Sequence, residues 1–399
     1  MAKKIMCLSL GLVLILVVAT PMLTSAQDQP RIGFWDECRE PTNLSGDVVI
    51  GVIFSLSGND ARYGNPQQQG LLFAVDEIND SDYLGDAFLI PLIEDGGSTP
   101  DSARQAMTNL VRDDSVVAVI GPTLSSQAFA ADPYAAEAGV PILSVSNTVA
   151  DITVMNDDED LDRYIFRSSL PEAEVIPRTI EVAVDDLGVQ TVAILYGNDD
   201  EFTTDSYNSF VEALRSESVQ ILAEQTFTRR TTNFSASLTT LLATNPDALV
   251  VSAFLSEAVP IVTQARSLGF DGLIIGGDGF NSSAFLSDTG SASNNVLVGA
   301  AWNAAGSGEV NKAFVDAYND AYGRMPDQFA AQAYTGTWLL ATAVRCANSD
   351  DPSNIRQALA DIEDFDSPLG EFTFDDNRNP VHEPLVQIVR NGQFEVIGD

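Results

Sequence analysis

Two adjacent serines, Ser125 and Ser126, follow a short apolar run and a Gly-Pro pair. The run 116–120 is typical of a buried strand, and the alanine-rich stretch after the serines is typical of a helix. Amide groups and the helix dipole make a helix N-terminus a natural site for an anion such as a carboxylate. Alternatively, the two hydroxyls only cap the helix. This segment alone leaves both interpretations open.

Two other predicted strands end in the same kind of residue. The run 48–54 ends in Ser55-Leu56-Ser57-Gly58 and is followed by Tyr63, and the run 141–145 ends in Ser146-Asn147-Thr148. Each ending alone could be an ordinary helix cap. Because open parallel sheets bind ligands at the carboxyl ends of their strands, three such endings together predict a polar cleft.

The residue types needed for common catalytic designs are scarce. His382 is the only histidine, which excludes multi-histidine zinc sites and makes Ser-His-Asp and Cys-His nucleophile designs depend on this one residue. The chain has no Gly-x-Ser-x-Gly elbow and no Gly-Lys of a phosphate loop. The segment 276–279, Gly-Gly-Asp-Gly, lacks the third glycine of a dinucleotide fingerprint. We therefore expect no enzyme, no metal and no cofactor.

Short apolar runs alternate with segments of helical spacing along most of the chain. One such helical segment carries Leu71, Leu72, Val75 and Ile78. Strands that alternate with helices predict an α/β fold whose parallel sheets are covered by helices on both faces. The apolar runs are 48–54, 88–93, 116–120, 141–145, 191–196, 248–254, 273–275 and 296–300.

The first 26 residues have the features of a secretory signal peptide. Lys3 and Lys4 precede the apolar stretch 5–19, and Thr24-Ser25-Ala26 offers a cleavage point after Ala26. The apolar stretch is too short for a comfortable membrane span. We expect an exported protein, periplasmic or extracellular at the cell surface, in which residues 27–46 form an N-terminal extension.

The net charge of the whole chain is −37. Such a surface cannot bind nucleic acid by neutralising phosphates, so no nucleic-acid partner is expected. The acidic residues are scattered and say little about the ligand. Beyond residue 26 the cysteines are Cys38 and Cys346. In an oxidising compartment they could form a disulfide or remain two separate thiols, and the sequence does not decide between these.

From Asp47 to Asp399 the chain resembles the branched-chain amino-acid (Leu/Ile/Val) binding proteins, which are type I periplasmic solute-binding proteins of ABC transporters. The resemblance rests on the order and spacing of many short motifs. They are Ser57-Gly58, Tyr63-Gly64, Gly70, Asp76-Glu77-Ile78-Asn79, Val119-Ile120-Gly121-Pro122, Ser125-Ser126, Val140-Pro141-Ile142, Ser146-Asn147-Thr148, Phe166-Arg167, Gln264-Ala265-Arg266-Ser267-Leu268-Gly269, Tyr334-Thr335, Ala341 and Gly370-Glu371-Phe372-Thr373-Phe374-Asp375.

The resemblance implies two doubly wound parallel-sheet lobes joined by a three-stranded hinge. Lobe 1 would comprise residues 47–167 and 303–369, and lobe 2 residues 168–302 and 370–399. The chain would cross between the lobes near 167–169, 300–303 and 369–371. The ligand would lie between the lobes, and hinge closure would bury it.

The resemblance also implies roles for individual residues. The carboxylate of an amino acid would bind Ser125 and the amides around it, Ser126 included. The ammonium group would bind the carbonyl of Ser146, the hydroxyl of Thr148 and the carboxylate of Asp278. Family members often carry Glu at the position of Asp278, which is one methylene longer.

An aromatic pocket for the ligand's side chain is implied by Tyr63, Phe202, Phe254 and Phe329, and it favours Leu, Ile, Val or Phe. Tyr is common in the family where Phe202 and Phe254 stand here. The implied function is delivery of an amino acid by a monomer to the permease subunits of an ABC importer in the membrane. The alternatives are a urea or short-amide binding protein of the same fold and a ligand-sensing receptor.

Overall fold

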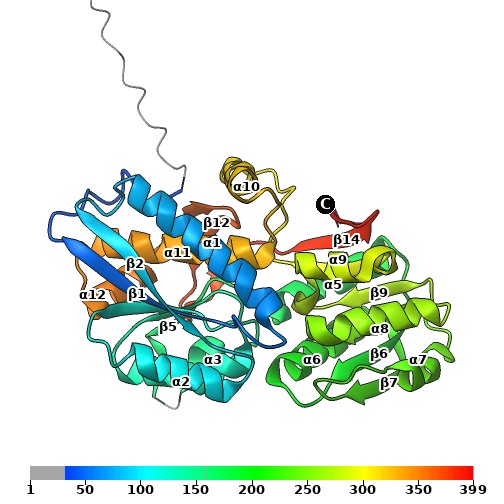
Figure 1. The fold of residues 1–399 in the computed structure, drawn as a ribbon. Coiled ribbons are helices and arrows are strands. Elements are labelled where there is room, and N and C mark those ends of the chain that lie inside the picture. The colour runs from blue at the N-terminus through cyan, green and yellow to red at the C-terminus, as the bar shows by residue number, and fades with distance from the viewer. Residues whose placement is uncertain (1–31, 157, 399) are drawn as a thin grey trace, which may run out of the picture. The chain divides into compact units, whose positions relative to one another are not determined.

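The structure, a computed structural model, describes residues 32–156 and 158–398 (Figure 1). The predicted signal peptide, 1–26, and the first residues of the predicted extension, 27–31, lie outside these ranges. Within the described ranges no helix combines the length and the apolar character that a membrane span needs.

The first lobe is built on five parallel strands in the order β2-β1-β3-β4-β5. Strand residues alternate between its two faces, so Ile50 and Val52 pack with one set of helices, and Ile53 and Val119 with the other. Helices α1 (Ala61–Asp80) and α11 (Gln328–Ala347), side by side in Figure 1, cover the first face, and α2 (Pro100–Leu110) and α3 (Ser125–Glu137) the second. The strands are β1 (Gly46–Phe54), β2 (Ala87–Asp95), β3 (Val116–Ile120), β4 (Ile142–Ser144) and β5 (Ile165–Arg167).

The second lobe is built on a seven-stranded sheet in the order β15-β14-β10-β9-β8-β6-β7. Its first five strands in the chain are parallel, and β14 and β15 add an antiparallel edge. Helices α5 (Glu172–Asp185) and α6 (Glu201–Ser216) cover one face, and α7 (Ser235–Leu242), α8 (Leu255–Ser267) and α9 (Ser283–Thr289) the other. The strands are β6 (Thr191–Gly197), β7 (Gln220–Phe227), β8 (Ala248–Ser252), β9 (Leu273–Gly276), β10 (Val296–Ala300), β14 (Leu385–Arg390) and β15 (Gln393–Ile397).

The remaining elements complete the described chain. They are the 3-10 turns η1 (Ile152–Val154), η2 (Asp278–Phe280) and η3 (Gly290–Ser293), the helices α4 (Glu159–Asp162), α10 (Glu309–Tyr322) and α12 (Pro352–Ala360), and the strands β11 (Phe365–Ser367), β12 (Gly370–Phe374) and β13 (Pro380–Val381). Strands β11, β12 and β13 form a small sheet of their own.

The chain passes between the two large sheets after β5, after β10 and before β14. The third passage differs from the prediction, which placed residues 370–399 in lobe 2. Phe372 and Phe374 are buried in the same apolar cluster as Phe54 and Phe166 of the first lobe. The guanidinium of Arg378 also donates to the carbonyl of Ile165, at 3.0 Å. Residues 370–381 therefore stay with the first lobe, and the third passage lies at 382–384.

The segment that precedes β1 packs on the first lobe. Cys38 and Cys346 are joined by a disulfide, with their Cα atoms 5.0 Å apart. The guanidinium of Arg345 donates to the carbonyl of Cys38 at 3.0 Å, and the amide of Phe34 donates to the hydroxyl of Tyr83 at 2.8 Å. These contacts attach the segment to the end of α11 and to the loop before β2.

Candidate functional site

A narrow cavity lies between the two lobes. Apart from Ser126 and Thr148, every residue predicted for the ligand site lines it. The lining residues are Tyr63, Thr123, Leu124, Ser125, Ser146, Phe202, Phe254, Asp278, Gly279 and Phe329. They come from four strand-end loops and from the starts of several helices, so the cavity exists only because both lobes contribute to it.

At one end of the cavity, helix α3 begins at Ser125. The residue at its N-cap is Leu124, whose apolar side chain cannot accept a hydrogen bond, so Ser125 and Ser126 are first-turn residues and do not cap the helix. In the described part of the chain the amides of both serines have no hydrogen-bond partner. Open amides and the helix dipole together give this end a positive potential that suits a carboxylate.

The loops that follow β3 and β4, next to this helix, are held together by a ring of hydrogen bonds. The hydroxyl of Thr123 donates to the side chain of Gln67 at 2.6 Å, Gln67 donates to the hydroxyl of Ser146 at 2.7 Å, and Ser146 donates back to the carbonyl of Thr123 at 2.7 Å. Gly121 allows the turn before them, since it has a φ of +104° and a Cβ there would lie 2.1 Å from the carbonyl oxygen of Ile53. The ends of β3 and β4 are therefore held together beside α3.

The opposite end of the cavity carries the carboxylate of Asp278. Its Oδ1 accepts hydrogen bonds from the side-chain amide of Gln328 at 2.6 Å and from that of Asn281 at 3.4 Å. Burial raises the pKa of Asp278 to about 6, and these two amides oppose the shift. The carboxylate is thus ionised at neutral pH and forms a negative pole opposite the start of α3.

Aromatic rings wall the cavity between these poles. Tyr63 of α1 packs against Phe329 of α11, with ring centroids 4.7 Å apart, and Phe202 of α6 packs against Phe254 at 4.8 Å. The hydroxyl of Tyr63 donates to the carbonyl of Gly279 at 3.0 Å and accepts from the amide of Leu255 at 2.5 Å. Its polar atom is therefore used in a link between the lobes, and its ring remains an apolar wall.

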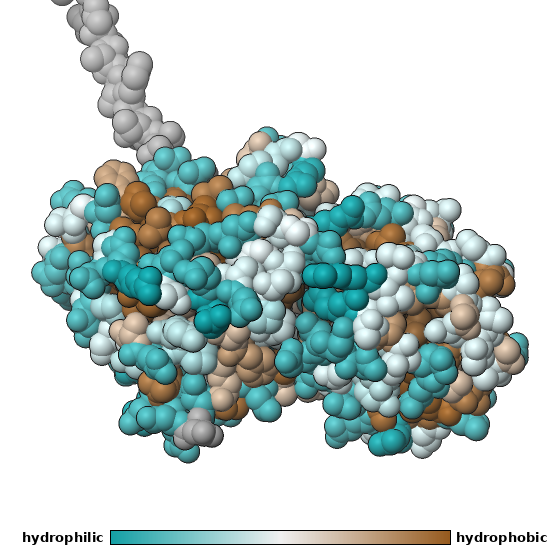
Figure 2. Space-filling model, turned by 60° about the horizontal axis from the view of Figure 1, so that its bottom comes forward, coloured by the Kyte–Doolittle hydropathy of each residue, from teal (hydrophilic) through white to brown (hydrophobic). Residues whose placement is uncertain are grey.

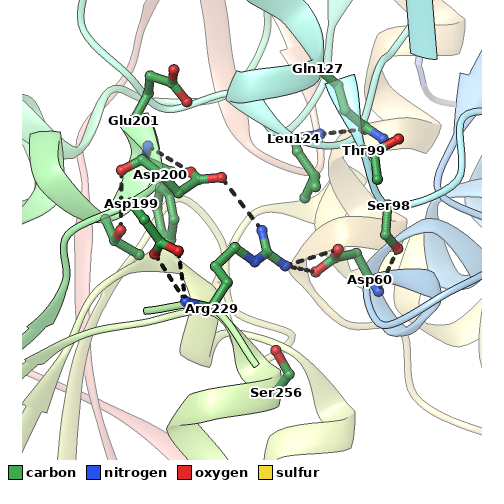
Figure 3. A network of polar contacts seen from close by, with 12 residues as sticks. Asp60, Ser98, Thr99, Leu124, Gln127, Asp199, Asp200, Glu201, Arg229 and Ser256 are labelled. Atoms are coloured by element: carbon green, nitrogen blue, oxygen red, sulfur yellow. Dashed lines mark hydrogen bonds and ion pairs between the residues drawn. The ribbon is translucent and has the colours of Figure 1, made fainter. Parts of the chain in front are cut away.

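A network of charged side chains links the two lobes beside the cavity (Figure 3). Arg229 lies 3.5 Å from the carboxylate of Asp200 and binds Asp60 of the first lobe, and its guanidinium stacks 3.8 Å above the ring of Phe254. Burial lowers the pKa of Arg229, but Asp60 and Asp200 more than offset this and raise it. Figure 2 shows strongly hydrophilic residues where the lobes meet on the face that it presents.

The two predicted residues that do not line the cavity, Ser126 and Thr148, contact residues next to it or in its lining. The hydroxyl of Ser126 contacts Asp200 of the second lobe; burial raises the pKa of Asp200, and this contact opposes the rise. The amide of Thr148 donates to the hydroxyl of Ser125 at 3.2 Å, so Thr148 supports the start of α3 from the side. Ser126 therefore links α3 to the second lobe, and Thr148 links the loop after β4 to α3.

Sequence reasoning missed four residues of the site. Thr123, Leu124 and Gly279 line the cavity, and their adjacency to Ser125 and Asp278 could have indicated them. Gln328 holds Asp278 from the start of α11, and no sequence pattern pointed to it. Across residues 32–156 and 158–398 there is no group of three or more His, Cys, Asp or Glu side chains placed to hold a metal ion.

Comparison with known proteins gives consistent likenesses. A model of the periplasmic binding protein family matches residues 47–393. Among curated relatives, the Leu/Ile/Val-binding protein BraC3 of Rhizobium johnstonii is 26% identical over 331 residues, which cover 82% of this chain and 87% of the relative.

Solved structures extend the likeness to the fold. The branched-chain amino acid transporter substrate-binding protein LivJ of Streptococcus pneumoniae, in complex with isoleucine, is 31% identical with a TM-score of 0.82; the match covers 88% of this chain and 99% of that one. The leucine-binding protein LivK of Thermotoga maritima is 25% identical with a TM-score of 0.81, covering 88% and 98%. The predicted fold class, with parallel sheets in two lobes, is confirmed.

Proposed function

Because the chain belongs to the periplasmic binding protein family, we propose that it captures a free amino acid with an apolar side chain between its lobes. The relatives named for leucine, isoleucine and valine, and the structural neighbour that holds isoleucine, support this ligand class. We assign residues 47–167 and 303–381 to the first lobe and 168–302 and 382–398 to the second.

The observation that carries the proposal is the pairing of two opposite poles from two lobes. The open amides at Ser125 suit a carboxylate, and the ionised Asp278 suits an ammonium group. In a free amino acid these two groups are attached to one carbon, so a ligand that satisfies both must bridge the lobes. Charge-assisted hydrogen bonds of this kind contribute about 1.5–3 kcal/mol each. Binding is thereby coupled to closure.

The apolar walls support selection of the ligand's side chain. Phe202, Phe254 and Phe329 offer no hydrogen-bonding group, and the hydroxyl of Tyr63 is already bonded on both sides. A charged or amide side chain would lose its hydration here without compensation, which disfavours it. Leucine, isoleucine, valine and phenylalanine remain as the class that fits.

The role follows from the family and the site together. The protein is exported, acts as a monomer, and delivers its ligand to the permease subunits of an ABC importer. We propose a binding role without a cofactor or catalysis, which the combination of charge recognition and apolar walls in the cavity supports.

Thermal unfolding of the mature protein tests the ligand class. The panel comprises leucine, isoleucine, valine, phenylalanine, aspartate, lysine, urea and acetamide. A ligand at a hundred times its Kd stabilises the folded state by about 2.7 kcal/mol, which is readily measured as a rise in Tm. We expect a rise with the apolar amino acids alone. A rise only with urea or acetamide would replace the amino acid by a short amide, and a rise with aspartate or lysine would overturn the apolar pocket.

A further inference from the structure

One buried carboxyl group beside the cavity was not among the predicted site residues. Glu172 is the first residue of α5, directly after the first passage between the lobes, and it is 2% exposed. Buried glutamates are rare unless they are paired, and in the described chain no lysine or arginine forms an ion pair with this one. Its place therefore calls for a role.

Glu172 contacts both loops of the proposed ammonium site, the one that carries Thr148 and the one that carries Asp278. Its backbone amide donates to the carbonyl of Thr148, in the first lobe, at 3.1 Å. Its side-chain Oε1 accepts from the backbone amide of Asp278, in the second lobe, at 2.5 Å. The approach requires a glycine beside it, because a Cβ on Gly277 would lie 2.4 Å from Oε1. One residue thus spans the distance between the two loops.

The loop that carries Thr148 is itself held by the same passage of the chain. The guanidinium of Arg167 donates to the carbonyl of Val149 at 2.5 Å and to that of Ala150 at 3.1 Å. The hydroxyl of Ser169 donates to the carbonyl of Asn147 at 2.8 Å. Because these bonds fix the loop, Glu172 positions Asp278 against a rigid reference.

The electrostatic state of Glu172 suits a structural contact better than a second charge. Burial raises its pKa to about 8; the nearby hydroxyl of Ser206 and the amide of Asp278 oppose the shift, and the charges of Asp278 and Asp205 add to it. At neutral pH the group is therefore a neutral acid. Its Oε2 has no hydrogen-bond partner among the described residues. The negative charge that faces the cavity thus belongs to Asp278.

We propose that Glu172 is a positioning residue that sets the place of Asp278 relative to the loop at Thr148, and thereby sets how strongly the site prefers a ligand with an ammonium group. The proposal rests on the proposed function, since it concerns the same cavity. The proposal predicts an effect on one part of the ligand only. The affinity that the ligand gains from its ammonium group depends on Glu172, whereas the affinity that it gains from its carboxylate and its side chain does not.

The experiment compares the Kd of leucine with that of 4-methylpentanoate, which is leucine without its amine, by isothermal titration calorimetry. We expect the wild type to bind leucine about 10- to 100-fold more tightly, as one charge-assisted hydrogen bond allows. Glu172→Ala should bring the two affinities within about threefold and leave 4-methylpentanoate unchanged. Glu172→Gln keeps an acceptor oxygen and should restore the preference.

Two further variants make the outcome decisive. Glu174→Ala removes an exposed carboxylate two residues along the same helix and should behave as the wild type. Gly277→Ala disturbs the contact without altering Glu172 and should also lower the preference, which covers the case in which Glu172→Ala does not fold. An unchanged preference in Glu172→Ala or Gly277→Ala would overturn the role of Glu172 alone. A wild type that fails to bind leucine would overturn the proposed function as well.

Discussion

The guanidinium of Arg229, in the second lobe, donates to both carboxylate oxygens of Asp60, in the first lobe, at 2.8 and 3.0 Å (Figure 3). The Asp60 side chain is 1% exposed and that of Arg229 is 20% exposed. An ion pair that is largely removed from water is more strongly coupled than a surface ion pair. Arg229 lies in the loop after β7, in the second lobe, and Asp60 lies directly before α1, in the first lobe, so opening of the lobes must break the pair.

Arg229→Ala should therefore weaken ligand binding by favouring the open form. Removal of one partner of a buried ion pair costs about 3–5 kcal/mol, because the other charge is left unpaired. In the open form Asp60 regains water, so the cost falls on the closed form. We expect the Kd of leucine to rise at least about tenfold.

Arg62→Ala is the matched control, since the ion pair of Arg62 with Asp288 also joins the lobes but is exposed. Such pairs contribute about 0–1 kcal/mol, so its Kd should change less than about fivefold. Equal effects of the two variants, measured by calorimetry, would contradict a special role for the buried pair.

Asp278 should make amino-acid binding depend on pH. Burial raises the pKa of this carboxyl to about 6 in the ligand-free protein. An ammonium group needs the ionised form, so affinity should be constant above about pH 7 and fall up to about tenfold per pH unit below 6. Asp278→Asn should bind leucine about 10- to 100-fold more weakly and show no such fall. A wild-type Kd that is constant from pH 5 to 8 would contradict this assignment.

Tyr63→Phe tests the link between the lobes without changing the apolar wall. The substitution leaves the amide of Leu255 and the carbonyl of Gly279 unpaired in the closed form. Each unmet buried group costs about 1–3 kcal/mol, so the Kd of leucine should rise about tenfold or more. The rank order among leucine, valine and phenylalanine should be preserved, and a changed order in competition titrations would show that the hydroxyl itself reads the ligand.

Asp132 of α3 should make folding stability depend on pH. It is fully buried, and neither carboxylate oxygen has a hydrogen-bond partner in the described structure. Burial raises its pKa well above the usual range, although the nearby Ser144 opposes the shift. The folded state thus binds the proton more tightly than the unfolded state, so the contribution of this group to stability is largest below about pH 4 and is lost as pH rises toward the raised pKa, by up to about 1.4 kcal/mol per unit.

Asp132→Asn removes this dependence. In urea unfolding, the variant should be more stable than the wild type at pH 7.5, and the difference should shrink at pH 4. A difference in the free energy of unfolding that is the same at both pH values would show that Asp132 is not protonated in the folded state.

The Cys38–Cys346 disulfide should affect stability and leave ligand binding unchanged. It closes a loop with a sequence separation of 308, for which chain entropy predicts a loss of up to about 6 kcal/mol when it is removed. The Cys38→Ala, Cys346→Ala double variant should therefore have a lower Tm but an unaltered Kd for leucine, because neither residue lines the cavity. A large rise in Kd would indicate that the N-terminal segment also supports the site.

Much of the fold could be predicted because parallel strands covered on both faces leave continuous apolar runs in the sequence. All eight runs became strands, as shown by β3 at Val116–Ile120 and β10 at Val296–Ala300. The eight runs do not include the strands from β11 to β15, nor β5, which has three residues, nor β7, an edge strand whose exposure is mixed. The resemblance implied a third passage near 369–371, whereas Phe372 and Phe374 are buried with Phe54 and Phe166 of the first lobe, a contact that no local sequence pattern indicates.

The polar residues that follow strands could also be found from the sequence alone, since strand ends of a parallel sheet converge on one edge. Ser125, Ser146 and Asp278 all lie at such ends, and they line one cavity. Gln328 and Glu172 could not be found this way, because each meets Asp278 only through packing between distant segments. By itself, the sequence determined the α/β class and the strand-end residues, because both arise from local patterns of apolar and polar positions. Only the tertiary structure decided that Arg229 meets Asp60, that Tyr63 reaches Gly279 and that Glu172 supports Asp278, because those contacts depend on how two separately built lobes come together.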